Sequence, residues 1–441
     1  MRATERTVDV GAVIDAQGIG SAQWVLIILC GLVALLDGLD LQAIGLAAPA
    51  IAQQLHIPPQ SLGAVFSAAL AGLTIGAFIL GPTADRVGRK GVLVAATLVF
   101  GVFTLATAHA ESFHTLLAYR FFAGVGLGGA MPSFISLASE YVPAKRRAAI
   151  VSLLWAAFPL GGTVGGLIAS RLIPAYGWPS IFIVGGALPL VIALVLLFAL
   201  PESLAFLINR GKPAERIART FRRVFPRADA PQGATFVFAR EAKAKADVRE
   251  LFVGGRAAGT LLLWVAYFFA FMILVTNSSW VPTLLRPLGV AVESSAVALA
   301  MYNFGSLFGS GAAGLLVETF GPVFILSLTM LGGGVAFAAI GWSAPSVTLV
   351  TIAETAFGFL VGCASSGLIA LAAIYYPSAI RSTGVGWATA MGRFGSFVGP
   401  LVVGSLLAAH WSVHVIFTTV GASIVIGAIA CTLMPSSRAK S

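Results

Sequence analysis

Long apolar runs recur along the whole of this chain, and they restrict it to one kind of architecture. Each run has about 20 residues with almost no charge, long enough to cross a hydrocarbon core of about 30 Å as a helix. Of all 441 residues, 58% are hydrophobic and only 10% are charged. We therefore predict an all-α integral membrane protein. The twelve predicted spans are 24–49, 61–80, 92–107, 116–137, 148–172, 181–200, 259–280, 296–317, 323–342, 347–374, 385–408 and 413–433.

The positive charges are distributed unevenly between the two sides predicted by these spans. The net charge of +10 could suggest a nucleic-acid partner. However, of the 27 Lys and Arg residues, only Arg171 and Arg286 fall outside and only Arg120 and Arg393 fall within spans, if both termini are cytoplasmic. The other 23 lie on cytoplasmic segments, which is the positive-inside pattern. The positive charges thus predict the orientation of the protein in the membrane, and we expect no nucleic-acid partner.

Two further features limit the class of protein. Residues 1–23 are charged and have no apolar core, so they are not a signal peptide and the first span should stay uncleaved. Cys30, Cys363 and Cys431 lie in apolar runs without paired spacing, so they predict neither a disulfide nor a metal framework.

One long polar segment, 201–256, divides the spans into six and six. Its stretch 213–224 has a basic face and helical character, and we expect it to lie along the inner membrane surface as a solvated linker, in preference to a regulatory site. The predicted organisation is an N-terminal cytoplasmic tail (1–23), a six-helix bundle (24–200), a cytoplasmic linker (201–256), a second six-helix bundle (257–434) and a short tail (435–441).

The two halves repeat each other. Shifting the second half by 234 residues superposes Gly124 on Gly358, Gly128 on Gly362, Ala138 on Ala372, Pro143 on Pro377, Arg147 on Arg381, Gly161 on Gly395 and Gly165 on Gly399. Such an internal duplication, with a substrate site where the halves meet, is typical of alternating-access secondary transporters.

Two carboxylates, Asp37 and Asp40, stand in the middle of the first span. Inserting a carboxylate at this depth of the membrane costs a free energy of about 2.5 kcal/mol or more, so such acids usually take part in proton or ion handling. Three residues apart, they share one helix face about 5–6 Å apart at the Cβ atoms. We predict that they couple a proton to transport and titrate as a pair, with one protonated unless a cation sits beside it.

The sequence Gly-Pro-Thr-Ala-Asp-Arg-Val-Gly-Arg-Lys (81–90) fills the predicted inner loop between the second and third spans. It resembles the signature loop of the major facilitator superfamily. Asp85 can cap a helix or pair with Arg86 or Arg89. The second-half copy around Glu318 has no arginine, so we expect an asymmetric inner gate. The predicted gating residues are Asp85, Arg86, Arg89, Glu140, Arg147, Glu318 and Arg381.

Gly124, Gly126 and Gly129 match a dinucleotide-binding pattern, but they follow no strand and lie within an apolar run. We interpret them as sites of close helix packing.

Three charged residues lie deep in later spans. Two interpretations of Arg120 stay open. It could have a structural role, as a partner of Asp40 or of backbone carbonyls near Glu140, or a functional role, in tuning proton release. Arg393 has no apparent acid at its depth, which favours binding of an anionic substrate. Glu354 is either a second protonatable group or, as we prefer, an acid on an outer surface of the bundle.

Aromatic and polar residues of several spans complete the predicted cavity, although most aromatics in spans only pack or form interface belts. The candidates are Trp155, Phe158, Trp264, Tyr267, Asn277, Tyr302, Asn303 and Trp387. The sequence has no Walker motif, HExxH pair or metal-ligand cluster, so we expect neither an enzyme nor a bound cofactor or metal.

Several motifs together resemble the aromatic acid:proton symporters of the major facilitator superfamily. They are Asp37-Gly-Leu-Asp40, residues 81–90, Arg120 with 124–132, Glu140-Tyr-Val-Pro143, Pro201-Glu-Ser203, Trp280-Val-Pro-Thr-Leu284, Arg381-Ser-Thr-Gly-Val-Gly-Trp387 and Gly392-Arg393. The resemblance implies two six-helix bundles in a bacterial-type inner membrane, and import of benzoate-like or hydroxybenzoate-like acids with protons. We expect a monomer. A carrier of the same fold for another organic anion, sugar or drug, and a receptor that transports nothing, are the alternatives.

Overall fold

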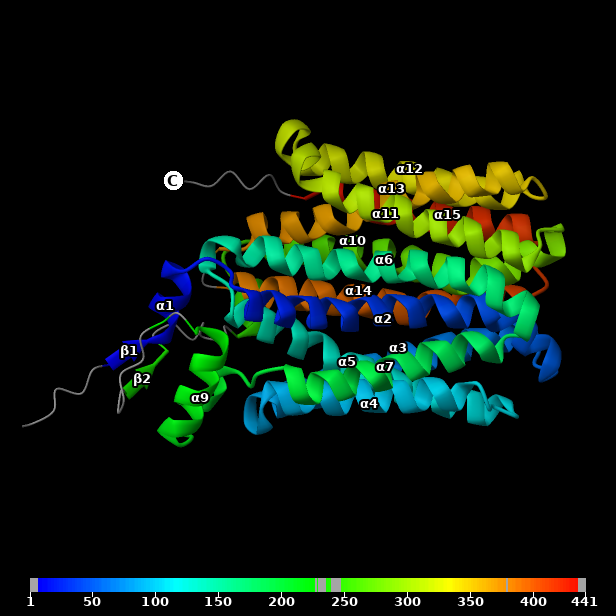
Figure 1. The fold of residues 1–441 in the computed structure, drawn as a ribbon. Coiled ribbons are helices and arrows are strands. Elements are labelled where there is room, and N and C mark those ends of the chain that lie inside the picture. Colours follow the sequence, from blue (N-terminus) through cyan, green and yellow to red (C-terminus); the bar gives the residue numbers. More distant parts are fainter. Residues whose placement is uncertain (1–6, 227, 229–234, 239–246, 378–379, 435–441) are drawn as a thin grey trace, which may run out of the picture.

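Long helices running side by side make up nearly all of the computed structural model, which describes residues 7–226, 228, 235–238, 247–377 and 380–434. Those of the first half are α2 (Ser21–Gln54), α3 (Leu62–Val87), α4 (Arg89–Thr107), α5 (Phe113–Glu140), α6 (Ala144–Tyr176) and α7 (Pro179–Ala199). Those of the second half are α10 (Ala257–Leu285), α11 (Val292–Phe320), α12 (Pro322–Ser343), α13 (Val347–Tyr375), α14 (Arg381–Ala408) and α15 (Val413–Thr432). Each overlaps one predicted span, and the predicted all-α fold class is confirmed (Figure 1).

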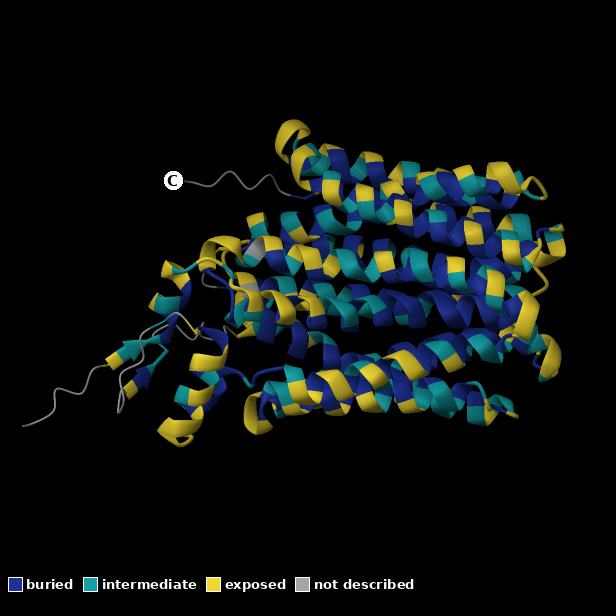
Figure 2. Cartoon of the chain, in the orientation of Figure 1, coloured by how far each residue is buried: buried dark blue, intermediate teal, exposed yellow. Residues whose placement is uncertain are grey.

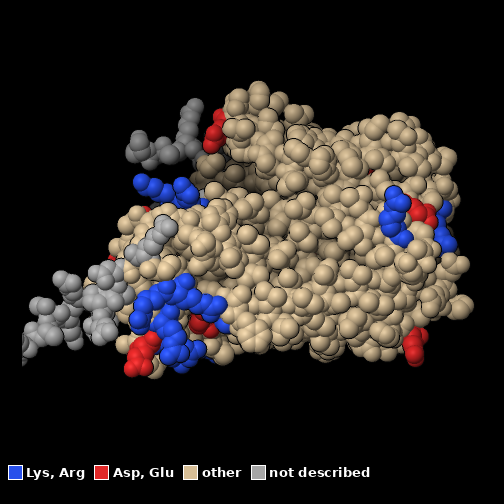
Figure 3. Space-filling model, viewed as in Figure 1, with Lys and Arg blue, Asp and Glu red and all other residues tan. Residues whose placement is uncertain are grey.

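The surface of the bundle matches a membrane environment. Among the described residues, eleven helices are long and apolar enough to cross a bilayer. The remaining long helix, α11, has 29 residues but includes Glu293, Asn303 and several serines, which make it less apolar. Figure 2 shows exposed residues on the outer faces of the helices, and Figure 3 shows Lys, Arg, Asp and Glu gathered at the two ends with a broad uncharged belt between them.

One end of the bundle, here called the linker end, carries α9 and the described chain termini (Figure 1). Its small elements are β1 (Thr7–Asp9), α1 (Val10–Ala16), α8 (Leu204–Asn209), α9 (Ala214–Val224), β2 (Thr235–Val237) and a 3-10 turn at Val248–Leu251. Further 3-10 turns at Pro59–Ser61 and Arg286–Leu288 lie at the opposite, far end. β1 and β2 pair in parallel with Thr7 opposite Thr235, a contact that the sequence analysis did not anticipate. The predicted tail at 435–441 lies outside the described residues.

Helix α9 forms where the sequence predicted a helix with a basic face, and its apolar face packs against the protein. Ile217, Phe221 and Val224 are buried in a cluster that also contains Leu204 and Leu207 of α8. An apolar stripe at helical spacing is buried wherever apolar partners are available. Here the protein provides those partners, so the stripe does not lie against lipid.

The packing follows the internal duplication. In the first half, a Cβ on Gly124 of α5 would meet the carbonyl of Ala69 in α3. In the second half, a Cβ on the equivalent Gly358 of α13 would meet the carbonyl of Tyr302 in α11. Equivalent glycines thus let equivalent helix pairs approach backbone to backbone, as small residues do in membrane helices.

The two halves meet at mid-depth and at the far end. Ser67 of α3 donates to the Phe397 carbonyl of α14 at 2.8 Å, and Arg286 donates to the Pro49 carbonyl at 3.2 Å and to Gln53 Oε1 at 3.0 Å. Among the hydrogen bonds that join described residues of the two halves, none lies at the linker end. Figure 3 shows a recess between the two lobes near that end.

We expect Gly124→Ala to lower the free energy of unfolding by about 1–3 kcal/mol, because the added methyl group would meet the Ala69 carbonyl. Gly311→Ala is the matched control, since a Cβ there meets nothing within 4 Å. That control should be neutral or stabilising, by up to about 1 kcal/mol, because Ala favours a helix over Gly. Thermal unfolding of both variants in one detergent measures the difference. Equal melting temperatures would contradict the close-packing interpretation.

Candidate functional site

A buried ion pair joins two helices of the first half. Arg120 of α5 donates to Asp40 of α2 twice, from Nη2 to Oδ2 at 2.6 Å and from Nη1 to Oδ1 at 2.9 Å. Thr104 of α4 donates to Asp40 Oδ1 at 3.1 Å, and the Phe182 ring of α7 lies 5.8 Å from the guanidinium carbon. Both charged side chains are 1% exposed or less. Four helices therefore surround one bidentate, charge-assisted ion pair.

This geometry decides part of the question left open for Arg120. The guanidinium pairs with Asp40 and not with backbone carbonyls near Glu140. A cation therefore sits beside Asp40, which compensates its negative charge inside the bundle. Thr104 was not predicted, because a threonine in an apolar run more often bonds a carbonyl of its own helix, as Thr97 does here to Leu93.

Asp37 has different neighbours from Asp40, although both lie on α2. Its side chain is 5% exposed and interacts electrostatically with Arg393 of α14, in the other half. Arg393 is half-buried, and its Nη2 lies 2.9 Å from Met131 Sδ of α5. The expectation that Arg393 has no nearby acid is wrong, because Asp37 lies within electrostatic range. The spacing of residues within α2 could not predict this, since it does not show which distant helix faces Asp37.

Glu354 of α13 is fully buried, so our preferred reading of an outer-surface acid is wrong. Its Oε2 accepts from Asn277 Nδ2 of α10 at 3.0 Å, and no described residue bonds Oε1. Under the 234-residue shift, Glu354 is the counterpart of Arg120. In each half, a buried side-chain contact thus joins the first long helix to the fourth. The Asp40–Arg120 ion pair joins α2 to α5, and the Asn277–Glu354 hydrogen bond joins α10 to α13.

Several predicted cavity residues belong to stacked aromatic pairs of the second half. The rings of Tyr267 and Phe271 lie 5.8 Å apart and almost parallel, and Tyr302 stacks on Phe357 at 5.6 Å. Trp264 and Trp387 stack at 5.8 Å. Phe271 and Phe357 were not predicted, because nothing in the sequence distinguishes them from the many other apolar aromatics.

The remaining cavity candidates are less uniform. Trp155 is 42% exposed and lies outside the buried clusters, and Trp387 is exposed to the same extent. The Phe158 side chain is half-buried, and its carbonyl lies against Gly38. Asn303 is buried and donates to the Leu299 carbonyl of its own helix at 2.9 Å. A role in substrate contact stays a prediction for all of these residues.

The predicted inner loop is a continuous helix followed by a one-residue turn. Asp85 lies in the last turn of α3, Gly88 turns the chain at φ +120°, and Arg89 starts α4. This corrects the expected loop at 81–90, since only Gly88 lies outside a helix. Arg89 approaches Asp85 at 3.5 Å and forms an ion pair with Glu140 at the end of α5.

A second layer of contacts surrounds this ion-paired group. Glu140 Oε2 accepts from Ser203 Oγ at 2.5 Å, and the Tyr141 hydroxyl donates to the Glu202 carbonyl at 2.5 Å. Burial raises the pKa of Tyr141 far above its ordinary value, so this phenol stays a donor. The other predicted gating residues lie at the same end: Arg86, Glu318 and Arg381 are exposed, and Arg147 is half-buried. Their gating role stays a prediction.

Comparisons with known proteins agree with this architecture. A profile described as Major Facilitator Superfamily matches residues 30–296 and 263–441. The chain is 40% identical over 417 residues to the 4-hydroxybenzoate transporter PcaK of Pseudomonas aeruginosa, covering 94% of this chain and 93% of that protein. It is 31% identical to a benzoate transport protein of Acinetobacter baylyi, covering 98% and 94%. A solved D-xylose-proton symporter superposes with TM-score 0.76 at 18% identity, covering 96% and 100%.

We expect Arg120→Gln to lower the free energy of unfolding by about 3–5 kcal/mol, because it leaves the Asp40 carboxylate buried without its cation. Adding Asp40→Asn should recover part of that loss, since two neutral amides can bond each other. Chemical denaturation in detergent tests both variants. Equal stability of the single and double variants would show that Asp40 is not the partner on which Arg120 depends.

We expect Asp85→Asn to slow turnover while substrate binding stays measurable. Asp85 lies at the linker end, about 15 Å or more from mid-depth, where it contacts Arg89 and no predicted cavity residue. Stability should change little, because the Asp85 side chain is 66% exposed. Equilibrium binding and transport rates on the same preparation separate the two effects. Loss of binding in a folded Asp85→Asn protein would assign Asp85 to the substrate site.

Proposed function

Because this chain belongs to the major facilitator superfamily, we propose that it imports an aromatic carboxylate of the benzoate or hydroxybenzoate class together with protons, by alternating access. The observation that carries the proposal is a pair of opposite charges inside the bundle, the buried Asp37 of the first half and the half-buried Arg393 of the second, which lie within electrostatic range of each other. The relatives named as 4-hydroxybenzoate and benzoate transporters support the substrate class.

An aromatic carboxylate needs three things from its carrier. Its charge needs a cation, its ring needs apolar or aromatic walls, and its entry into a negative interior needs a compensating positive charge. Moving one negative charge inward against 100 mV costs about 2.3 kcal/mol, and one co-transported proton cancels that cost for a monoanion. Arg393 can supply the cation and Asp37 the proton-binding group.

The Asp37–Arg393 attraction suggests how the two cargoes are coupled. While Asp37 is ionised, it competes with a substrate carboxylate for Arg393. A proton on Asp37 removes this competition, so protonation favours substrate binding and bound substrate favours protonation. Asp40 is already held in a buried ion pair with Arg120, whereas Asp37 forms no ion pair with any described residue. We therefore assign the transported proton to Asp37.

The ring of the substrate has its best support on the helices around Arg393. α14 carries both Arg393 and Trp387, and α10 carries the stacked pair Tyr267 and Phe271. Flat aromatic faces pack well against an aromatic ring when the centroids are about 4.5–7 Å apart. The wall and the cation thus come from the second half, and the proton site comes from the first.

The proposed orientation places the linker end in the cytoplasm of a bacterial-type inner membrane. The basic residues of α9 and of the turn after α3 lie at that end, in agreement with the positive-inside rule. We propose that this arrangement is an inward-facing state of the cycle, because the hydrogen bonds described between the halves lie at mid-depth or at the far end. We propose that the monomer is the transporting unit.

We expect proteoliposomes with purified protein to accumulate 4-hydroxybenzoate or benzoate when the outside is made more acidic than the inside. Asp37→Asn should abolish uphill accumulation yet bind substrate, because Asn imitates the protonated acid, whereas Arg393→Ala should lose binding at least tenfold, as expected when a buried charge partner is removed. The Asp40→Asn variant should also lose uphill uptake, because the substitution leaves the buried Arg120 without its counter-charge. Arg171→Ala, on an exposed far-end residue, is the control and should match the unaltered protein.

Two outcomes of the same assays contradict the proposal in different ways. If Asp37→Asn accumulates aromatic acid as the unaltered protein does, the proton site lies elsewhere, with Glu354 the next candidate. If other organic anions, sugars or drugs are taken up and no aromatic acid is, the substrate class is wrong.

A further inference from the structure

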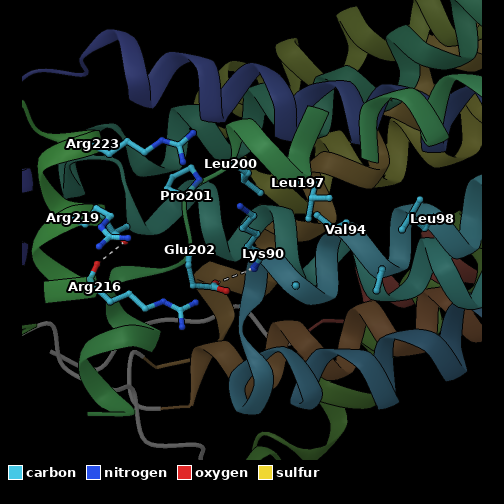
Figure 4. Close-up of a pocket in the computed structure, with 13 residues that line it drawn as sticks. Lys90, Val94, Leu98, Leu197, Leu200, Pro201, Glu202, Arg216, Arg219 and Arg223 are labelled. Carbon is cyan, nitrogen blue, oxygen red and sulfur yellow. Dashed lines mark hydrogen bonds between the residues drawn. The ribbon is translucent and has the colours of Figure 1, made fainter. Parts of the chain in front are cut away.

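A pocket of about 480 Å³ opens at the linker end, apart from the proposed transport site. It lies between the start of α4 and the end of α7, both in the first half, and the helix α9 of the linker (Figure 4). Four cationic side chains line it, Lys90 from α4 and Arg216, Arg219 and Arg223 from α9. The arginines share a face because they are three, four and seven residues apart.

These cations have no counter-charge of comparable size. Among the described residues, none of the four lies within ion-pair distance of a carboxylate. The one acid in the lining, Glu202, accepts instead from the backbone N–H groups of Lys90 at 3.0 Å and Ser203 at 2.9 Å. Lys90 lies within electrostatic range of Arg223 and Arg216, which repel it, and of Glu202, which attracts it, so one acid faces four cations. Such a group is stabilised when an anion enters the pocket.

The rest of the lining is apolar and reaches into the membrane belt. Val94 and Leu98 lie on α4, Leu197 lies in the last turn of α7, and Leu200 follows directly after that helix. Leu98 is 41% exposed and Leu197 is 48% exposed, so this wall is open to the surroundings of the bundle. A ligand that satisfies both parts of the pocket must carry an anionic group at one end and an apolar chain at the other.

We propose that this pocket binds an anionic phospholipid of the leaflet at the linker end. The phosphate would lie among Lys90, Arg216 and Arg219, and an acyl chain would follow Val94 and Leu98 into the bilayer. Arg223 has a second role, since its Nη2 donates to the Phe198 and Ala199 carbonyls at 2.8 and 2.9 Å and so caps α7. Basic pockets between membrane helices are known to hold such headgroups.

The lipid would also connect the linker to the first bundle. α9 belongs to the linker, whereas Lys90 follows Arg89, which pairs with Glu140. A headgroup held by both would fix α9 against the start of α4. The proposed site does not depend on which substrate is carried, because no residue near Asp37 or Arg393 lines the pocket.

The test uses the full-length protein in detergent, titrated with phosphatidylglycerol or phosphatidylcholine and observed by native mass spectrometry. We expect phosphatidylglycerol to stay bound and phosphatidylcholine to dissociate. Arg216→Gln with Arg219→Gln should weaken phosphatidylglycerol binding roughly tenfold to thirtyfold. The matched control, Lys212→Gln with Arg222→Gln, removes the same charge outside the pocket lining and should leave the affinity unchanged.

Three results would overturn the lipid assignment. The first is equal weakening by the pocket and control variants, which would mean that only net charge matters. The second is equal retention of phosphatidylcholine. The third is displacement of the lipid by inorganic phosphate at equal concentration, which would identify a soluble anion as the ligand. Unchanged melting temperatures for both double variants exclude misfolding, and Lys90→Gln, from the opposite wall, should weaken binding in the same direction.

Discussion

The pairing of Asp40 with Arg120 is the interaction on which the first half depends. An ion of either sign is very costly in a membrane interior, and only a well-formed contact with further hydrogen bonds compensates that cost. Asp40, Arg120, Thr104 and Phe182 come from four different helices, so the pair forms only when α2, α4, α5 and α7 are assembled. The same contact leaves Asp37 as the acid of α2 that faces the other half.

The two halves have the same framework and opposite chemistry. Glycines at equivalent positions bring equivalent helices together, as at Gly124 and Gly358. Where the first half has the buried cation Arg120, the second has the buried acid Glu354. The duplication thus conserves the packing that every bundle needs, while the charged positions differ between the copies. The two halves therefore place charges of opposite sign at equivalent positions.

The helices and their grouping were predictable because apolar length and small-residue spacing are local properties of the sequence. The contacts of the site were less predictable. Spacing placed Asp37 and Asp40 on one face of α2, but their partners, Arg393 and Arg120, lie on helices that only the assembled bundle brings near. α9 shows the same limit: its sequence predicted a helix with a basic face, whereas the partner of its apolar face depended on where α8 lies.

The parallel pairing of β1 with β2 has a consequence for biosynthesis. β1 is made first, yet its partner strand follows all six helices of the first bundle. During translation, the N-terminal segment therefore has to wait until residue 237 has left the ribosome before these strands can join. When they do, the contact joins the segment before the first bundle to the linker that follows it.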